Sequence, residues 1–222
     1  KHVVLEKPMS TTLDSCERIL TAARAARAAH GAVFMVAEQA QYWEDALAVQ
    51  RLIRDGVLGE IITARAYFGG PAHPLTGPKP WRYYNKFAGG GLTIDGGAHW
   101  LRPLRMWLGE IDEVVATIGH PIKEMEGESL VRALLRFQSG TVAVFDALHG
   151  GAHAGGGEEF RITGTLGEVL IEKGHGARVM LFDAAHPHGE SLMIKDEGRR
   201  AAQMTLIAAV ASGEVDFTTF SV

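Results

Sequence analysis

Two short apolar runs flank a helical pattern at the start of the chain. The first run, Val-Val-Leu, is apolar on both faces and predicts a buried strand over residues 1–6, which Pro8 ends. Apolar residues then recur at helical spacing after Ser10 or Thr11, either of which can cap the helix. A second apolar run fills residues 32–37. Strand, helix and strand in this order predict a βαβ unit of a parallel sheet.

The pattern changes after a second helical stretch at residues 42–55, which Gly56 ends. From residue 60 onward, β-rich runs joined by short turns dominate, and they predict a largely antiparallel sheet. The predicted fold is therefore an α+β region attached to the tail of an α/β domain. Its predicted strands are residues 61–68, 113–118, 130–137, 141–148, 159–163, 168–171 and 178–182, and its further helices are residues 91–108 and 197–211.

Composition narrows the class of protein. The 222 residues are 46% hydrophobic and 22% charged, which is ordinary for a soluble globular protein. The net charge is −4 and no block of like charges stands out, so neither nucleic acid nor a membrane surface is a predicted partner. No apolar run is long enough to cross a bilayer. The single cysteine, Cys16, cannot form an internal disulfide, and we expect a reducing, cytoplasmic setting.

Two separated segments carry the candidate chemistry. Lys7 stands after the first predicted strand, and ligands of an open parallel sheet bind at the carboxyl ends of its strands. Asp95 and His99 lie four residues apart, on one face of any helix they share. Together the three residue types can polarise an oxygen and move its proton. The structural alternatives are a solvated lysine and a helix-surface pair worth a few tenths of a kcal/mol.

Glycines surround the Asp95–His99 pair. Gly89, Gly90 and Gly91 precede the pair, and Gly96 and Gly97 lie inside it. Each glycine costs a helix roughly 1 kcal/mol. We therefore expect a ligand or another backbone segment to approach this stretch closely.

These segments resemble the glucose–fructose oxidoreductase / inositol dehydrogenase / MocA family (Gfo/Idh/MocA), whose members are two-domain, nicotinamide-dependent sugar and polyol dehydrogenases. Residues 52–61, LIRDGVLGEI, also resemble the family's entry into its second domain. The motifs that carry the resemblance are Glu6-Lys7-Pro8, Trp81-Arg82, Gly89-Gly90-Gly91 and Asp95-Gly96-Gly97-Ala98-His99.

The resemblance implies a fold with two parts. Residues 1–39 are expected to be the C-terminal part of a dinucleotide-binding (Rossmann) domain. Residues 40–222 are expected to form an α/β substrate-binding domain, with a large, mainly antiparallel open sheet and helices on one face. The resemblance also implies a homodimer or homotetramer that forms through this sheet. It further implies a cis peptide bond between Lys7 and Pro8.

The resemblance further implies an NAD(P)-dependent oxidoreductase that transfers a hydride between the nicotinamide and a sugar, polyol or related hydroxy or keto compound. Lys7 would hydrogen-bond the reacting oxygen, and His99 would take the hydroxyl proton, with Asp95 orienting His99 or contacting the substrate. Which of Lys7 and His99 is the formal acid–base stays open. Glu6, Lys7 and Pro8 are the expected cofactor contacts, and Trp81, Arg82, Asp95 and His99 are the expected substrate contacts.

Several neighbouring residues allow more than one interpretation. Trp81 and Trp100 are candidate pocket residues, with core packing as an equal alternative. His149 and His153 form an H-x-x-x-H that, with His99, invites a metal-dependent hydrolase or lyase. No helix fixes their spacing and no acidic third ligand is evident, so we predict no metal site.

The cofactor fingerprint that the family carries is absent. No G-x-G-x-x-G precedes Lys7, and the residues that choose between NAD and NADP would follow that motif. We expect the chain to lack about the first half of a nucleotide domain, and residues 216–222 to stop short of a final helix. A non-catalytic binding or assembly module of the same fold is therefore the second hypothesis.

Overall fold

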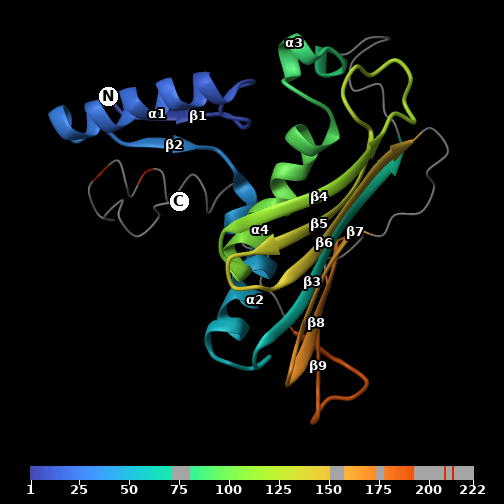
Figure 1. Ribbon diagram of the computed structural model, residues 1–222. Coiled ribbons are helices and arrows are strands. Elements are labelled where there is room, and N and C mark those ends of the chain that lie inside the picture. Colours follow the sequence, from blue (N-terminus) through green and yellow to red (C-terminus); the bar gives the residue numbers. More distant parts are fainter. Residues whose placement is uncertain (72–80, 151–157, 174–177, 193–207, 209–211, 213–222) are drawn as a thin grey trace.

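A βαβ unit opens the chain, as the apolar pattern predicts. The computed structural model describes residues 1–71, 81–150, 158–173 and 178–192, together with residues 208 and 212. Strands β1 (Val3–Leu5) and β2 (Phe34–Val36) pair in parallel, and helix α1 (Leu13–His30) connects them (Figure 1).

Two local predictions about this unit are wrong. Helix α1 is capped by Thr12, because its extended backbone lets the side chain accept a hydrogen bond from the Ser15 N–H. Neither Ser10 nor Thr11 fills that position. Strand β1 is not buried: Val3 is 50% exposed and Val4 is 48% exposed. Within the described residues β1 has only β2 as a paired neighbour, and α1 buries no residue.

A short connector leads from β2 to the larger part of the fold. It is the 3₁₀ helix η1 (Gln39–Tyr42), and helix α2 (Glu44–Arg54) follows directly. The predicted apolar face of α2 packs inward, with Ala46 and Val49 buried. Gly56, at φ 74°, takes the left-handed conformation after the helix, as expected of a glycine that ends one.

Eight strands form one sheet in the order β10-β9-β8-β7-β3-β6-β5-β4. Among the described strands of this sheet only β3 and β6 pair in parallel, and every other neighbouring pair is antiparallel.

All seven predicted strands are confirmed, and β10 is an additional strand that the pattern does not predict. The predicted helix at residues 197–211 lies outside the described residues, apart from residue 208. The strands are β3 (Ile61–Pro71), β4 (Ile111–Gly119), β5 (Leu130–Phe137), β6 (Val142–Gly150), β7 (Glu158–Gly164), β8 (Gly167–Lys173), β9 (Arg178–Asp183) and β10 (Glu190–Leu192).

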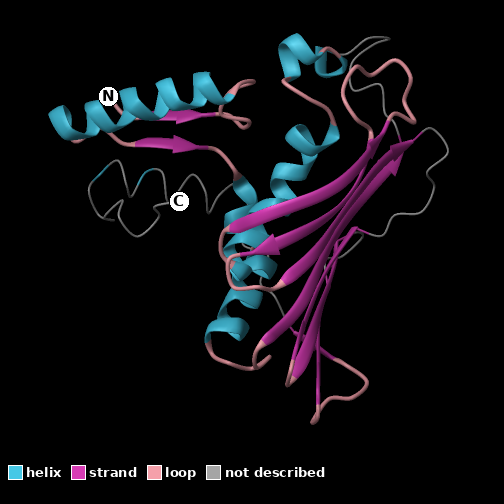
Figure 2. Ribbon diagram, viewed as in Figure 1, coloured by secondary structure: helices cyan, strands magenta, loops and turns pink. Residues whose placement is uncertain are grey.

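Helices α2 and α4 (Ala98–Leu108) lie on one face of this sheet (Figure 2). The two tryptophans of α4 meet the sheet at Phe160 of β7. The Trp100 ring stacks on that ring with centroids 4.6 Å apart, and the Trp107 ring meets it edge-on at 5.0 Å. Trp100 is therefore a core residue, as the packing alternative proposed. The predicted α/β plus α+β fold with helices on one face is confirmed, and none of the described helices is long and apolar enough to span a bilayer.

One ion pair lies inside this helix–sheet interface. Lys173, at the end of β8, places Nζ 2.6 Å from Oδ2 of Asp45 in the first turn of α2, and the two side chains are only 5% and 4% exposed. The same Nζ lies 3.5 Å from the centroid of the Trp43 ring. The pair therefore fixes the start of α2 against the sheet.

We predict that Lys173→Met destabilises the fold by about 3–5 kcal/mol, because it leaves the buried Asp45 carboxylate without its counter-charge. The double variant with Asp45→Asn should recover most of that loss. Urea denaturation measures the free energy of unfolding of the single and the double variant. The matched control is Arg54→Met, which breaks the exposed pair with Asp55 and should cost less than about 1 kcal/mol. Equal stability of Lys173→Met and the unmodified chain would contradict the prediction.

Candidate active site

Lys7 and Asp95 meet although they lie 88 positions apart in sequence. Lys7 follows β1, and its Nζ donates to the Asp95 carbonyl oxygen at 2.7 Å and to Oδ1 at 3.1 Å. The Lys7–Pro8 peptide bond is cis, which confirms that prediction. Lys7 therefore lies at the carboxyl end of a parallel strand, with its ammonium turned toward the segment that precedes α4.

Arg82 is the second cation on Asp95. Its Nε lies 3.0 Å from Oδ2, so each carboxylate oxygen of Asp95 faces a different cation. The Arg82 guanidinium also lies over the ring of Trp81, with 4.7 Å from Cζ to the ring centroid. Trp81 and Arg82 belong to the short helix η2 (Trp81–Tyr83), and Trp81 is half-exposed rather than part of the core. The structure thus brings three of the predicted site residues together and places an aromatic ring beside them.

His99 has a partner that the sequence did not reveal. Its Nδ1 lies 2.7 Å from Oε1 of Glu38, and the two side chains are 18% and 13% exposed. The carboxylate that contacts His99 is therefore that of Glu38 rather than that of Asp95. Glu38 lies two residues after β2, just as Lys7 lies two residues after β1. That position at the carboxyl end of a parallel strand was the available signal.

The glycines around Asp95 have structural causes. A Cβ on Gly91 would overlap backbone atoms of Glu128, a Cβ on Gly96 would lie 2.8 Å from the Phe68 ring, and one on Gly97 would lie 3.1 Å from the Phe145 ring. The expected backbone approach is thus found at Gly91, whereas Gly96 and Gly97 make room for aromatic rings. These glycines let the segment sit directly on the sheet.

Glu128 anchors the segment that carries Asp95. Its carboxylate accepts hydrogen bonds from the N–H groups of Gly91, at 3.0 Å, and Thr93, at 2.8 Å. Its carbonyl accepts a third from the Leu92 N–H at 2.8 Å. These bonds satisfy donors at the start of the helical segment, which runs as a π-helix η3 (Thr93–Gly97) before α4 begins. The predicted helix at residues 91–108 therefore exists, with a wider first turn.

The contacts beside His99 are partly withdrawn from water. Arg102, one turn further along α4, donates to Oε1 of Gln41 in η1 at 2.8 Å. Burial lowers the pKa of the Arg102 guanidinium, and the charge of Arg105 lowers it further. Burial also raises the pKa of the Tyr42 hydroxyl. Both side chains are partly buried where α4 contacts η1.

The structure gives the remaining candidate residues other surroundings. Glu6 is exposed. The His149 ring meets the Phe68 ring edge-on, with centroids 6.1 Å apart, and His153 lies outside the described residues. Within the described ranges no group of three His, Cys, Asp or Glu side chains is arranged to hold a metal ion.

Comparison with known proteins gives one family and several relatives. Residues 46–170 match the family model of the GFO/IDH/MocA C-terminal domain. The chain is 32% identical over 174 residues to the 1,5-anhydro-D-fructose reductase of Ensifer adhaerens, covering 77% of this chain and 49% of the reductase. It is 25% identical over 222 residues to the 2,7-anhydro-N-acetylneuraminate hydratase of Escherichia coli (strain K12), covering 96% of this chain and 57% of the hydratase.

The fold also matches solved structures. Levoglucosan dehydrogenase in complex with NADH superposes with a TM-score of 0.80 at 20% identity, covering 96% of this chain and 65% of that chain. The chain spans about half the length of the curated relatives it matches.

We predict that Gly91→Ala destabilises the fold by about 1–3 kcal/mol, because its Cβ meets backbone that cannot turn aside as a flexible side chain can. Thermal unfolding measures the change. Gly70→Ala is the matched control, since a Cβ there meets nothing within 4 Å. A Gly91→Ala variant that unfolds at the same temperature as the control would contradict the close contact between Gly91 and the Glu128 backbone.

Proposed function

Because the chain belongs to the Gfo/Idh/MocA family, we propose that it is the catalytic and substrate-binding part of a nicotinamide-dependent oxidoreductase that acts on a sugar, polyol or related hydroxy compound. Two contacts support the proposal: Lys7 after β1 reaches Asp95, and Glu38 after β2 reaches His99 at the start of α4. Residues 1–39 would belong to the dinucleotide-binding domain, and residues 40–222 to the substrate domain.

The chemistry of these side chains fits the reacting end of NAD or NADP. Glu6, Lys7 and Pro8 follow β1, and they are the residues that would hold the nicotinamide end of the cofactor. A bound nicotinamide would supply the acceptor or donor of the hydride. The cation of Lys7 suits that place, because oxidation of an alcohol develops negative charge on the alcohol oxygen.

Lys7 has one N–H left for the substrate. A lysine ammonium carries three donors, and two of them reach the carbonyl and the carboxylate of Asp95. The third would hydrogen-bond the reacting oxygen and stabilise its alkoxide character. Asp95, held from the other side by Arg82, would keep the ammonium in that orientation.

His99 would exchange the proton of the reacting hydroxyl. Its Nδ1 is engaged by Glu38, so Nε2 is the ring nitrogen that would accept the proton during oxidation and return it during reduction. The half-exposed Trp81 ring beside Arg82 would give the sugar an apolar face to pack against.

For the substrate class we propose a sugar closed by an internal anhydro bridge, or a closely related pyranose. Two curated relatives carry such a substrate in their names, the 1,5-anhydro-D-fructose reductase and the 2,7-anhydro-N-acetylneuraminate hydratase. The second name is that of a hydratase, so a lyase-type outcome is a defined alternative. The non-catalytic hypothesis is less well supported, because a binding module needs neither the Lys7 ammonium nor a carboxylate on His99.

We predict that the intact protein that carries this chain oxidises or reduces an anhydrosugar with NAD(H) or NADP(H), followed by the nicotinamide absorbance. Lys7→Met should lower kcat by about 10²–10³-fold, because it removes the donor to the reacting oxygen. Lys86→Met is the control, because Lys86 lies exposed on helix α3 (Asn85–Ala88). Binding of cofactor and sugar with no turnover would favour the non-catalytic module.

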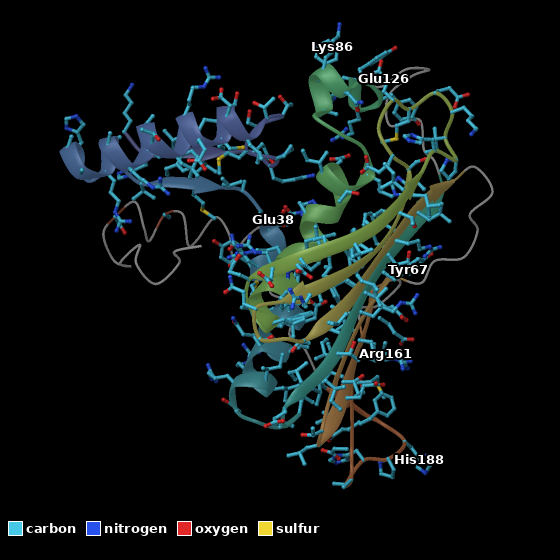
Figure 3. The ribbon with its side chains drawn as sticks, in the orientation of Figure 1. Glu38, Tyr67, Lys86, Glu126, Arg161 and His188 are labelled. Carbon is cyan, nitrogen blue, oxygen red and sulfur yellow. The ribbon has the colours of Figure 1, made fainter. Side chains whose placement is uncertain are left out.

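We also propose a homodimer or homotetramer through the face of the sheet opposite α2 and α4. Val115 and Leu134 lie opposite each other in the β4–β5 register and are 71% and 51% exposed. Figure 3 shows Tyr67 and Arg161 on the same side of the sheet, away from the helices. Apolar side chains exposed together on a sheet face mark an association surface.

We predict that light scattering finds a dimer or tetramer, and that Leu134→Asp shifts it toward the monomer because it buries a charge in the interface. Leu13→Asp changes an equally apolar residue on α1, 86% exposed, and should leave the mass unchanged. A monomer at every concentration in the unmodified protein would refute this interface.

A further inference from the structure

We propose that Glu38 is a positioning residue for His99, holding the imidazole in the tautomer whose proton sits on Nδ1. Its catalytic consequence rests on the proposed function, but the contact itself does not. Glu38 would touch neither cofactor nor substrate, and would act only through His99.

The geometry of the contact selects the tautomer. An ionised carboxylate only accepts hydrogen bonds, so at 2.7 Å from Oε1 the Nδ1 atom must carry the proton. The neutral ring then has its lone pair on Nε2. The Trp43 ring lies beside the imidazole, with centroids 6.3 Å apart, and both partners of the hydrogen bond are largely buried. Exclusion of water strengthens such a hydrogen bond.

Glu38 is itself fixed in place. Its Oε1 also accepts the N–H of Ala40 at 2.9 Å, which caps the first turn of η1. Its Oε2 is buried and has no hydrogen-bond partner within the described residues. Among the residues that the structure describes, the carboxylate therefore bonds its own turn and His99.

A regular register between two segments brings Glu38 to His99. The hydrogen bonds His99–Glu38, Arg102–Gln41 and Trp107–Ala46 each join residues 61 positions apart. Helix α4 thus runs alongside η1 and the start of α2 with a constant offset. Figure 3 shows Glu38 where the chain leaves β2, just before η1. The Glu38–His99 hydrogen bond is one of three along this interface. The other two, Arg102–Gln41 and Trp107–Ala46, therefore also keep Glu38 and His99 close together.

The chemistry of this arrangement is that of a histidine held by a carboxylate. When Nε2 accepts a proton, the ring becomes a cation, and the adjacent carboxylate stabilises it. Loss of the carboxylate charge would leave the ring free to place its proton on Nε2, where it could no longer accept one. Carboxylate partners of metal-bound histidines change activity by about 10–100-fold when removed, and we expect a loss of that size for Glu38.

The test compares Glu38→Gln with Gln41→Ala in the intact protein. Imidazole ¹⁵N NMR reads which nitrogen of His99 carries the proton, and steady-state kinetics read kcat and KM separately. We expect an Nδ1–H tautomer in the unmodified protein and in Gln41→Ala, which removes the next contact along the same interface. Glu38→Gln should populate the Nε2–H tautomer and lower kcat by about 10–100-fold, with KM changed far less.

The outcomes separate this proposal from the proposed function. An Nε2–H tautomer in the unmodified protein overturns the positioning role without any variant. A tautomer that Glu38→Gln does not change, or a changed tautomer with unchanged kcat, also overturns it. If the tautomer responds as expected in a protein that transfers no hydride, the Glu38–His99 coupling is supported and the proposed function fails.

Discussion

The site depends on two polar contacts between the βαβ unit and the segment that begins α4. Lys7 reaches Asp95, and Glu38 reaches His99, across 88 and 61 positions of sequence. Both partners on the N-terminal side follow strands that run in parallel, so β1 and β2 deliver them to the same edge. Moving either strand or α4 by a few ångströms would separate Lys7 from Asp95 and Glu38 from His99.

The position of α4 is set by packing rather than by the charged residues. Trp100 and Trp107 meet Phe160 of the sheet, and Gly96 lets the Phe68 ring approach the segment in front of the helix. Glu128 fixes the start of the same segment through three hydrogen bonds. The large sheet therefore acts as the rigid support for Asp95 and His99, while the βαβ unit supplies Lys7 and Glu38. A site assembled in this way gains precision from elements that contribute none of its polar groups.

Local patterns predicted much of this structure, and tertiary contacts account for what they missed. The strand–helix–strand opening, the seven longer strands, and the cluster of Lys7 and Asp95 follow from periodicity, glycine positions and a family resemblance. The exposure of Val3 and the partner of His99 do not, because both depend on which segments meet in space. Glu38 carries no motif of its own, and the charge pair Lys173–Asp45 joins two elements far apart in the chain. Strand β10 has three residues, too few for a periodic signal.

We propose that a sugar reacts between Lys7, held by Asp95, and His99, held by Glu38. The most direct measurement is a crystal structure of the intact protein with a nicotinamide cofactor and an anhydrosugar bound. The account predicts one sugar oxygen within about 2.6–3.2 Å of both Lys7 Nζ and His99 Nε2, with its carbon facing the nicotinamide. A sugar bound elsewhere, with the Lys7–Asp95 and Glu38–His99 contacts unchanged and no ligand beside them, would show that this cluster is structural.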